Sequence, residues 1–216
     1  MSIDNLPQPI KDAIINENNF DDYEAMPNNF SITEVLYCLR KKYYQKTLPK
    51  KPINLETAVN YHRGNVWDRD FCSKLKRNQV RSTYRCHTVP IAVSGKFDFL
   101  DENNVITDLK SPGDLYYVER EGKPNSHYEK QVRFYCYTNA IPRGQVMYWN
   151  GGPKCIKYSV EITDEKCEEL INEIEARVCI LYNSLQNSQA PNITTFPPED
   201  WECKKCDWIT ECKNEV

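Results

Sequence analysis

The chain lacks any long hydrophobic run, and this absence limits the class of protein that it can be. No apolar stretch approaches the roughly 20 residues that a membrane-spanning helix requires. The N-terminal stretch also lacks a basic segment followed by an apolar one, so we expect no secretory signal and a cytoplasmic location. The 216 residues are enough to bury the core of one medium-sized domain, with or without appendages.

A strong positive net charge is also missing, because the formal net charge is −3. This sum argues weakly against a nucleic-acid partner, but the distribution of the charges matters more. Six Lys and Arg residues and no acid lie between Arg40 and Lys51, and the same holds between Phe71 and Phe97. Such segregation can form a basic groove on an acidic protein, or two ordinary solvated faces.

Cysteine, in contrast, is abundant, with ten residues in the chain. A secreted scaffold held by disulfides does not fit this length without a signal, so metal binding explains some of the cysteines better. Cys203, Cys206 and Cys212 form a C-x2-C-x5-C pattern that is typical of a metal site. Zinc sites and cubane clusters commonly take four ligands. Cys38 is the candidate for the fourth ligand, and it would connect the N- and C-terminal parts of the chain.

Residues 95–110 predict a β-hairpin, because two short apolar-rich runs flank the turn-forming sequence DENN. Side chains alternate between the faces of a strand, so Asp108 and Lys110 project on one side and Leu109 on the other. Asp98 lies on the neighbouring strand, where its carboxylate can converge with that of Asp108. Two acids and a lysine can hold a divalent ion and polarise a phosphate. The alternative is a surface hairpin whose charged groups face water.

The rest of the chain alternates between helical and strand patterns. Helices are predicted at 32–46, 55–77, 127–139 and 163–185, a strand at 84–93, a loop at 111–126 and a second hairpin at 145–160. His62 and Asp68 are six positions apart on the second helix, about 240° around it, so at most one can reach a common site. Gln131 and Tyr135 are neighbours on one helix face and can hold a phosphate or a base. Ordinary surface polarity is the alternative for this pair.

Taken together, these motifs resemble one known family across residues 31–213. The chain resembles the CRISPR-associated RecB-like nucleases (the Cas-four family) of the PD-(D/E)xK superfamily. The matching features are the cysteine in YCLRKKYY, the Gly95–Asp98 segment, the acid-x-lysine motif DLK, the QxxxY motif and the C-terminal cysteine triad. Two positions depart from the family pattern. The acid before x-Lys is often glutamate, and the first motif commonly has histidine where this chain has Asp68.

The resemblance implies an α/β fold with a RecB-like (restriction-endonuclease-like) mixed β-sheet flanked by helices. It implies one nuclease domain over residues 1–216, with an N-terminal extension at 1–30. An iron–sulfur module at 190–216, together with Cys38, would join the N- and C-terminal segments. The cluster would be 4Fe–4S rather than 2Fe–2S, held by the four cysteines named above. The expected location in the cell remains cytoplasmic.

The resemblance also implies a metal-dependent DNA exonuclease that acts on single-stranded DNA or frayed duplex ends. Mg²⁺ or Mn²⁺ would be bound by Asp98, Asp108 and the carbonyl of Leu109, completed by either His62 or Asp68, with His62 preferred because the family site uses imidazole. Lys110 would orient the attacking water, and Gln131 and Tyr135 would position the strand. Some members trim DNA before spacer integration, which makes a CRISPR integrase complex an implied partner. The rival interpretation is a catalytically inactive iron–sulfur or zinc protein that binds DNA as an adaptor.

Overall fold

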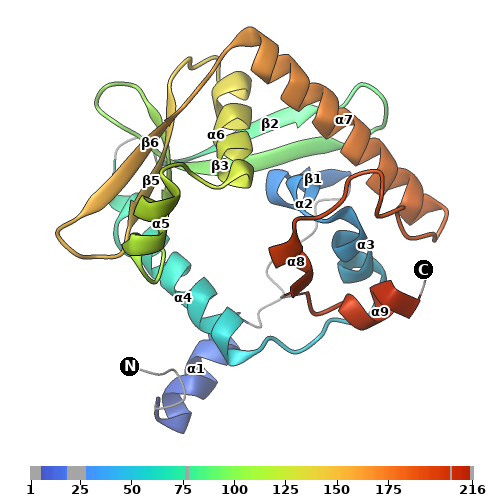
Figure 1. Ribbon diagram of the computed structural model, residues 1–216, viewed down its shortest axis with the longest axis horizontal. Helices are drawn as coiled ribbons and strands as arrows, with labels where there is room; N and C mark the ends of the chain where they lie inside the picture. Colours follow the sequence, from blue (N-terminus) through green and yellow to red (C-terminus); the bar gives the residue numbers. More distant parts are fainter. Residues whose placement is uncertain (1–5, 19–27, 76–77, 205, 215–216) are drawn as a thin grey trace.

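The computed structural model describes residues 6–18, 28–75, 78–204 and 206–214 of the chain. A mixed β-sheet flanked by helices forms the upper part of the view in Figure 1, with further helices below it. In chain order the elements are α1 (Gln8–Asn18), β1 (Asn29–Ser31), α2 (Ile32–Leu36), α3 (Leu39–Thr47), α4 (Leu55–Asp70), the 3₁₀ helix η2 (Cys72–Lys74), β2 (Asn78–Arg85), β3 (Ala92–Leu100), β4 (Ile106–Lys110), α5 (Leu115–Glu121), α6 (Ser126–Thr138), β5 (Gly144–Trp149), β6 (Cys155–Val160), α7 (Asp164–Gln186), α8 (Asp200–Lys204) and α9 (Ile209–Asn214).

Strand β3 is the branching point of the sheet. Strand β2 pairs with it antiparallel along its length, while β1 pairs parallel with its start and β4 antiparallel with its end. Because a strand has only two edges and β2 occupies one of them, β1 and β4 share the other. Residues 95–98 of β3 lie between these two partners, where the sheet is open. Strands β5 and β6 continue the sheet beyond β4.

The helix α6 covers the sheet at this opening. Its apolar face supplies Val132 and Phe134, both 0% exposed, and α6 contacts β3, β4 and β5. Asn125 caps the helix by accepting a hydrogen bond from the backbone N–H of His127. The long helix α7 packs in turn against α2, α3 and α6. The predicted mixed sheet flanked by helices is therefore confirmed, as are the hairpins β3–β4 and β5–β6.

The helix predicted at 32–46 is interrupted. Its capping box is present, since Ser31 and Glu34 bond each other's backbone N–H, but α2 ends at Leu36 and α3 begins at Leu39. Tyr37 is extended between them and stacks on His127. The prediction of one continuous helix did not include this ring contact, which accompanies the break. Because the helix is broken, Cys38 is the N-cap residue of α3.

Three other predicted boundaries are wrong. The segment 84–93 is not one strand: it holds the end of β2, a turn at 86–91 and the start of β3, and the bond from Cys86 N–H to the Ile91 carbonyl closes the turn. The loop predicted at 111–126 contains α5, which Asp114 caps and Gly122 ends at a positive φ of 66°. The helix predicted at 55–77 ends at Asp70 and is followed by the short η2.

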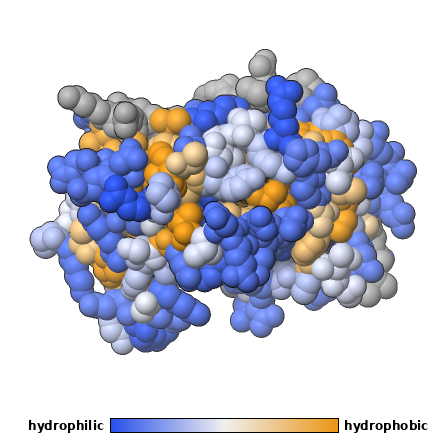
Figure 2. Space-filling view, turned by 90° about the horizontal axis from the view of Figure 1, so that it is seen from above, coloured by the Kyte–Doolittle hydropathy of each residue, from blue (hydrophilic) through white to orange (hydrophobic). Residues whose placement is uncertain are grey.

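The surface is mainly hydrophilic on the face seen in Figure 2, where hydrophobic residues gather in separate patches. Within the described residues, no helix combines the length and the hydrophobicity needed to cross a membrane.

Candidate active site

The hairpin β3–β4 brings the two predicted acids together. Its strands pair at Phe99–Thr107 and Leu100–Ile106, so Asp98 and Asp108 are the next residues along each strand, one opposite the other. The backbone N–H of Leu109 donates a hydrogen bond to Asp98 Oδ2. Asp108 is 3% exposed. The turn DENN thus sets a register in which two carboxylates meet at the open end of the hairpin.

Lys110 is the cation beside these two acids. Its Nζ lies 2.8 Å from Asp108 Oδ2, and beyond that ion pair this buried oxygen accepts no hydrogen bond from the described residues. Burial alone would lower the pKa of Lys110, but the carboxylates of Asp108 and Asp98 outweigh burial and raise the pKa above its usual range. Lys110 therefore remains a cation at neutral pH.

Gln131 and Tyr135 of α6 face the same group. Both side chains are buried, and Gln131 Nε2 donates to the Tyr135 hydroxyl over 3.4 Å. Burial raises the pKa of Tyr135, and the nearby charge of Asp108 raises it further, so the phenol stays protonated. Gly95 allows this approach: a Cβ there would lie 2.7 Å from Ile32 Cγ2 and 2.9 Å from Tyr135 Cε1. The structure thus brings together five predicted residues from three elements, β3, β4 and α6.

The two alternative ligands on α4 are placed differently. His62 Nδ1 lies 2.5 Å from Glu17 Oε2 of α1, so its partner here is an exposed acid on another helix. Asp68 belongs to the same helix, but its side chain lies outside the described residues. Among the side chains that are described, no three from His, Cys, Asp and Glu already stand where they could share a metal ion. The choice between His62 and Asp68 stays a prediction.

Arg63 and Ser111 are polar residues near the site that sequence reasoning missed. A Cβ added at Gly113 would lie 3.7 Å from Arg63 Nη1, which places α4 against the loop that follows Lys110. Arg63 Nε and Ser111 Oγ are buried and have no hydrogen-bond partner among the described residues. No spacing pattern in the sequence connects these two residues, because Arg63 lies on α4 and Ser111 on the loop after β4.

The structure gathers the four predicted cysteines, all among the residues that it describes, around one pocket, without placing any three of them where they already could share a metal ion. A single pocket is lined by all four cysteines assigned to it: Cys38, Cys203, Cys206 and Cys212. Tyr44 and Trp208 give this pocket apolar walls and stack with ring centroids 6.2 Å apart. Burial raises the pKa of the Cys38 and Cys203 thiols. A bound metal cation is the kind of partner that deprotonates such thiols.

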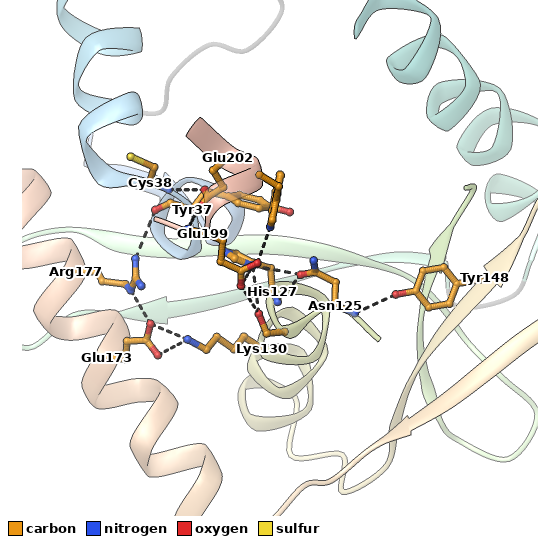
Figure 3. Close-up of polar contacts among 12 residues, drawn as sticks. Tyr37, Cys38, Asn125, His127, Lys130, Tyr148, Glu173, Arg177, Glu199 and Glu202 are labelled. Carbon is orange, nitrogen blue, oxygen red and sulfur yellow. Dashed lines mark hydrogen bonds and ion pairs between the residues drawn. The ribbon is translucent and has the colours of Figure 1, made fainter. Parts of the chain in front are cut away.

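A network of rings and charges joins this cysteine pocket to α6 (Figure 3). The rings of Tyr37 and His127 stack with centroids 4.5 Å apart, and Trp201 of α8 packs edge-on against both. The backbone N–H of Cys38 donates to Glu202 Oε1 over 2.9 Å.

The charged part of the same network lies on the helices behind these rings. Glu173 of α7 binds Lys130 of α6 at 2.7 Å and also Arg177 at 2.7 Å. Arg177 Nη1 lies 3.5 Å from the Tyr37 carbonyl, to which it donates a hydrogen bond. The helix that carries Gln131 and Tyr135 is therefore tied to the cysteine segment.

The sequence matches no protein-family model and no curated protein. Among solved structures, the crystal structure of SSO0001 is similar with a TM-score of 0.64 at 17% identity, covering 100% of both chains. An alkaline exonuclease (LHK-Exo) from Laribacter hongkongensis gives a TM-score of 0.51 at 13% identity, over 74% of this chain and 91% of that chain. A phage-related exonuclease from Haemophilus somnus 129PT gives 0.51 at 13% identity, over 69% and 81%. At these identities the likeness is one of fold: the chain shares its mixed sheet and flanking helices with exonuclease structures.

Proposed function

We propose that the chain is a divalent-metal-dependent DNA nuclease that acts on strand ends. The observation that carries this proposal is the meeting of Asp98, Asp108 and Lys110 at the open end of the β3–β4 hairpin. Its fold is like that of two proteins described as exonucleases, which supports the same reaction class. The narrower kinship with the CRISPR-associated iron–sulfur nucleases, and an integrase partner, remain predictions from sequence motifs.

The donor set at the hairpin fits Mg²⁺ or Mn²⁺. These ions prefer carboxylate and carbonyl oxygens, and Asp108 Oδ2 is a buried carboxylate oxygen whose partner among the described residues is the ammonium group of Lys110, with no further hydrogen bond from them. Asp98, Asp108 and the Leu109 carbonyl would hold the ion. When bound, it would lower the pKa of a coordinated water and neutralise charge on the scissile phosphate.

The side chains around the acids have separate tasks in this proposal. Lys110, held as a cation by the two carboxylates, would orient the attacking water and face the developing negative charge. Gln131 and Tyr135 would bind the phosphate backbone, because a buried amide and a protonated phenol are both donors. Arg63 would add a guanidinium that still has an unused buried donor.

We also propose that the cysteine pocket holds an iron–sulfur cluster, 4Fe–4S rather than 2Fe–2S. Four cysteines lining one pocket with aromatic walls fit the ligand number of such a cluster. Zinc uses the same ligands, and the colour of the purified protein separates the two: zinc leaves it colourless, whereas a cluster absorbs visible light. The role of the site would be to hold the C-terminal segment against α3 and, through Tyr37 and His127, against α6.

The decisive experiment is a nuclease assay on end-labelled single-stranded DNA with Mn²⁺, using protein purified without oxygen. We expect degradation that EDTA stops and that Asp108→Asn reduces by about 100-fold or more, since even residues behind a metal ligand are worth 10–100-fold. Asp101→Asn is the matched control, because the asparagine oxygen can still accept the turn bonds from Asn103 and Val105. A folded, coloured protein that binds DNA without cutting it would replace the nuclease proposal with the adaptor.

A further inference from the structure

A second pocket lies beside the candidate site and is lined by tyrosines. It has a volume of about 560 Å³, within the range of small-molecule sites. Its walls come from α5, from the start of α6 and from β5, and they include the rings of Tyr117, Tyr128 and Tyr148. None of these three residues belongs to the motifs from which the nuclease site was predicted.

Two of these rings are held in place before any ligand arrives. Tyr148 is 5% exposed, and its hydroxyl accepts a hydrogen bond from the Asn125 backbone N–H over 3.3 Å, drawn in Figure 3 well away from Cys38. The ring of Tyr158 packs edge-on against it with centroids 6.1 Å apart. The ring of Tyr128 lies 6.3 Å from that of Tyr148 at an angle of 56°. Rigid rings lose little entropy when a flat ligand binds against them.

The pocket is connected to the candidate site through one lysine. Lys110 Nζ lies 4.6 Å from the centroid of the Tyr128 ring and 2.8 Å from Asp108 Oδ2. Tyr128 is therefore part of the pocket wall and a direct neighbour of the proposed phosphate-facing cation. A flat group bound in the pocket would therefore lie next to a phosphate bound at the hairpin.

We propose that this pocket binds the unpaired nucleobase at the end of the DNA strand, stacked on the ring of Tyr128, which the buried ring of Tyr148 supports. This inference rests on the proposed function, because it places the adjoining phosphate at Lys110. A paired base is joined along its edge to the partner base and cannot enter a pocket by itself, so a base released from pairing is the form that can stack inside it. Glu121 and Glu199 on the rim can accept hydrogen bonds from exocyclic amino groups, and Lys123 can meet a backbone phosphate.

The test compares DNA strands that differ only in the base at one end. Single-stranded oligonucleotides carry either adenine or an abasic residue as the last nucleotide, at the 5′ or the 3′ end. We expect kcat/KM for the first cleavage with Mn²⁺ to fall by about 10-fold for the abasic form of one end, because a stacked base is worth about that factor. Tyr128→Leu should lower the rate on the adenine end by a similar factor more than it lowers the abasic rate, so that the ratio of the two rates falls toward one.

The abasic strand separates stacking from an indirect effect on Lys110. If Tyr128 served only to position Lys110, Tyr128→Leu would slow both strands equally, and the inference would be overturned. Tyr137→Leu is the control, since Tyr137 is an exposed tyrosine of α6 outside the pocket. Equal rates of the wild-type protein on adenine and abasic ends would also overturn it.

A binding series in EDTA distinguishes failure of the pocket from failure of the nuclease. Fluorescence anisotropy gives the Kd of both kinds of strand without any cleavage. If the protein never cuts but still prefers the adenine end, and Tyr128→Leu removes that preference, the base pocket stands and the nuclease proposal falls. Equal affinity for the two ends, or no binding of either, rejects the pocket.

Discussion

Lys110 has two partners of different kinds, the carboxylate of Asp108 and the ring of Tyr128. Replacing it with methionine keeps most of the volume and removes the charge. We expect Lys110→Met to reduce cleavage by about 100-fold or more, as loss of a charge-stabilising donor does, while the Kd for DNA stays near the wild-type value. Nuclease assays and anisotropy measure the two quantities. Cleavage at the wild-type rate would remove Lys110 from the mechanism.

The same variant reports on the metal. Without Lys110, no lysine cation offsets the negative charges of Asp108 and Asp98, and the repulsion between the two carboxylates increases. A divalent ion bound between them would relieve this larger repulsion. We therefore expect Mn²⁺ to raise the Tm of Lys110→Met more than it raises the Tm of the wild-type protein. Equal shifts, measured with Mn²⁺ against EDTA, would indicate that the ion binds away from this pair of acids.

Gly95 lies at the point where the backbone of β3 packs against the ring of Tyr135. A methyl group there would meet Ile32 Cγ2 and Tyr135 Cε1 below 3 Å, so Gly95→Ala should lower the free energy of unfolding by about 1–3 kcal/mol and displace Tyr135. Gly64→Ala in α4 is the contrasting variant, because a Cβ there would meet no described atom within 4 Å outside the neighbouring helix backbone. That substitution should be neutral or should stabilise by up to about 1 kcal/mol through helix propensity. Chemical denaturation of both variants measures the contrast.

Helices and strands were predicted well where the signal is local in sequence, and poorly where their bounds depend on contacts between distant residues. The hairpin at 95–110 and the helix at 127–139 came from turn residues and periodicity, which act over a few positions. The break at Tyr37 could not be found in this way, because it accompanies ring stacking on His127, which is distant in sequence. The turn between β2 and β3 was missed because apolar residues continue through it.

The stack at the start of α6 predicts a pH dependence of stability. Burial lowers the pKa of His127 below its ordinary value of 6.5, although Glu202 and Glu199 oppose this shift. A lowered folded-state pKa means that stability is fully present above the unfolded-state pKa and is lost as the pH falls. The Tm should therefore decline between about pH 7.5 and 5.5, where histidine titrates.

His127→Phe tests this prediction, since phenylalanine keeps a ring beside Tyr37 but cannot take up a proton. We expect the Tm difference between the two pH values to be smaller in this variant than in the wild-type protein. Thermal denaturation by circular dichroism measures it. Identical pH profiles would assign the decline to groups other than His127.

For the whole molecule, the cysteine pocket is the connection between the two ends of the fold. Cys203→Ala should remove visible absorption and lower the Tm by about 5 °C or more, because binding energy at a metal site is also folding energy. Cys155→Ala is the control, since Cys155 is an exposed cysteine at the start of β6 and does not line the pocket. A Cys203→Ala protein with unchanged colour and Tm would contradict the site.

Residues of the candidate site could be predicted from the sequence where they belong to the same short stretch of chain. Asp98, Asp108 and Lys110 belong to one hairpin, and Gln131 and Tyr135 to one helix turn, so spacing alone places each group. The residues that sequence reasoning missed come to the site from separate elements. Arg63 arrives on α4 and Tyr148 on β5, and only the packing of those elements brings them near.

The hydrogen bond from Cys38 to Glu202 spans 164 positions of the chain. During synthesis the hairpin and α6 leave the ribosome long before Cys212, so they can fold while the cysteine pocket is still incomplete. A group that binds all four cysteines, as proposed above, would therefore enter only a nearly finished chain. Assembly of this proposed site would follow translation of the chain rather than accompany it.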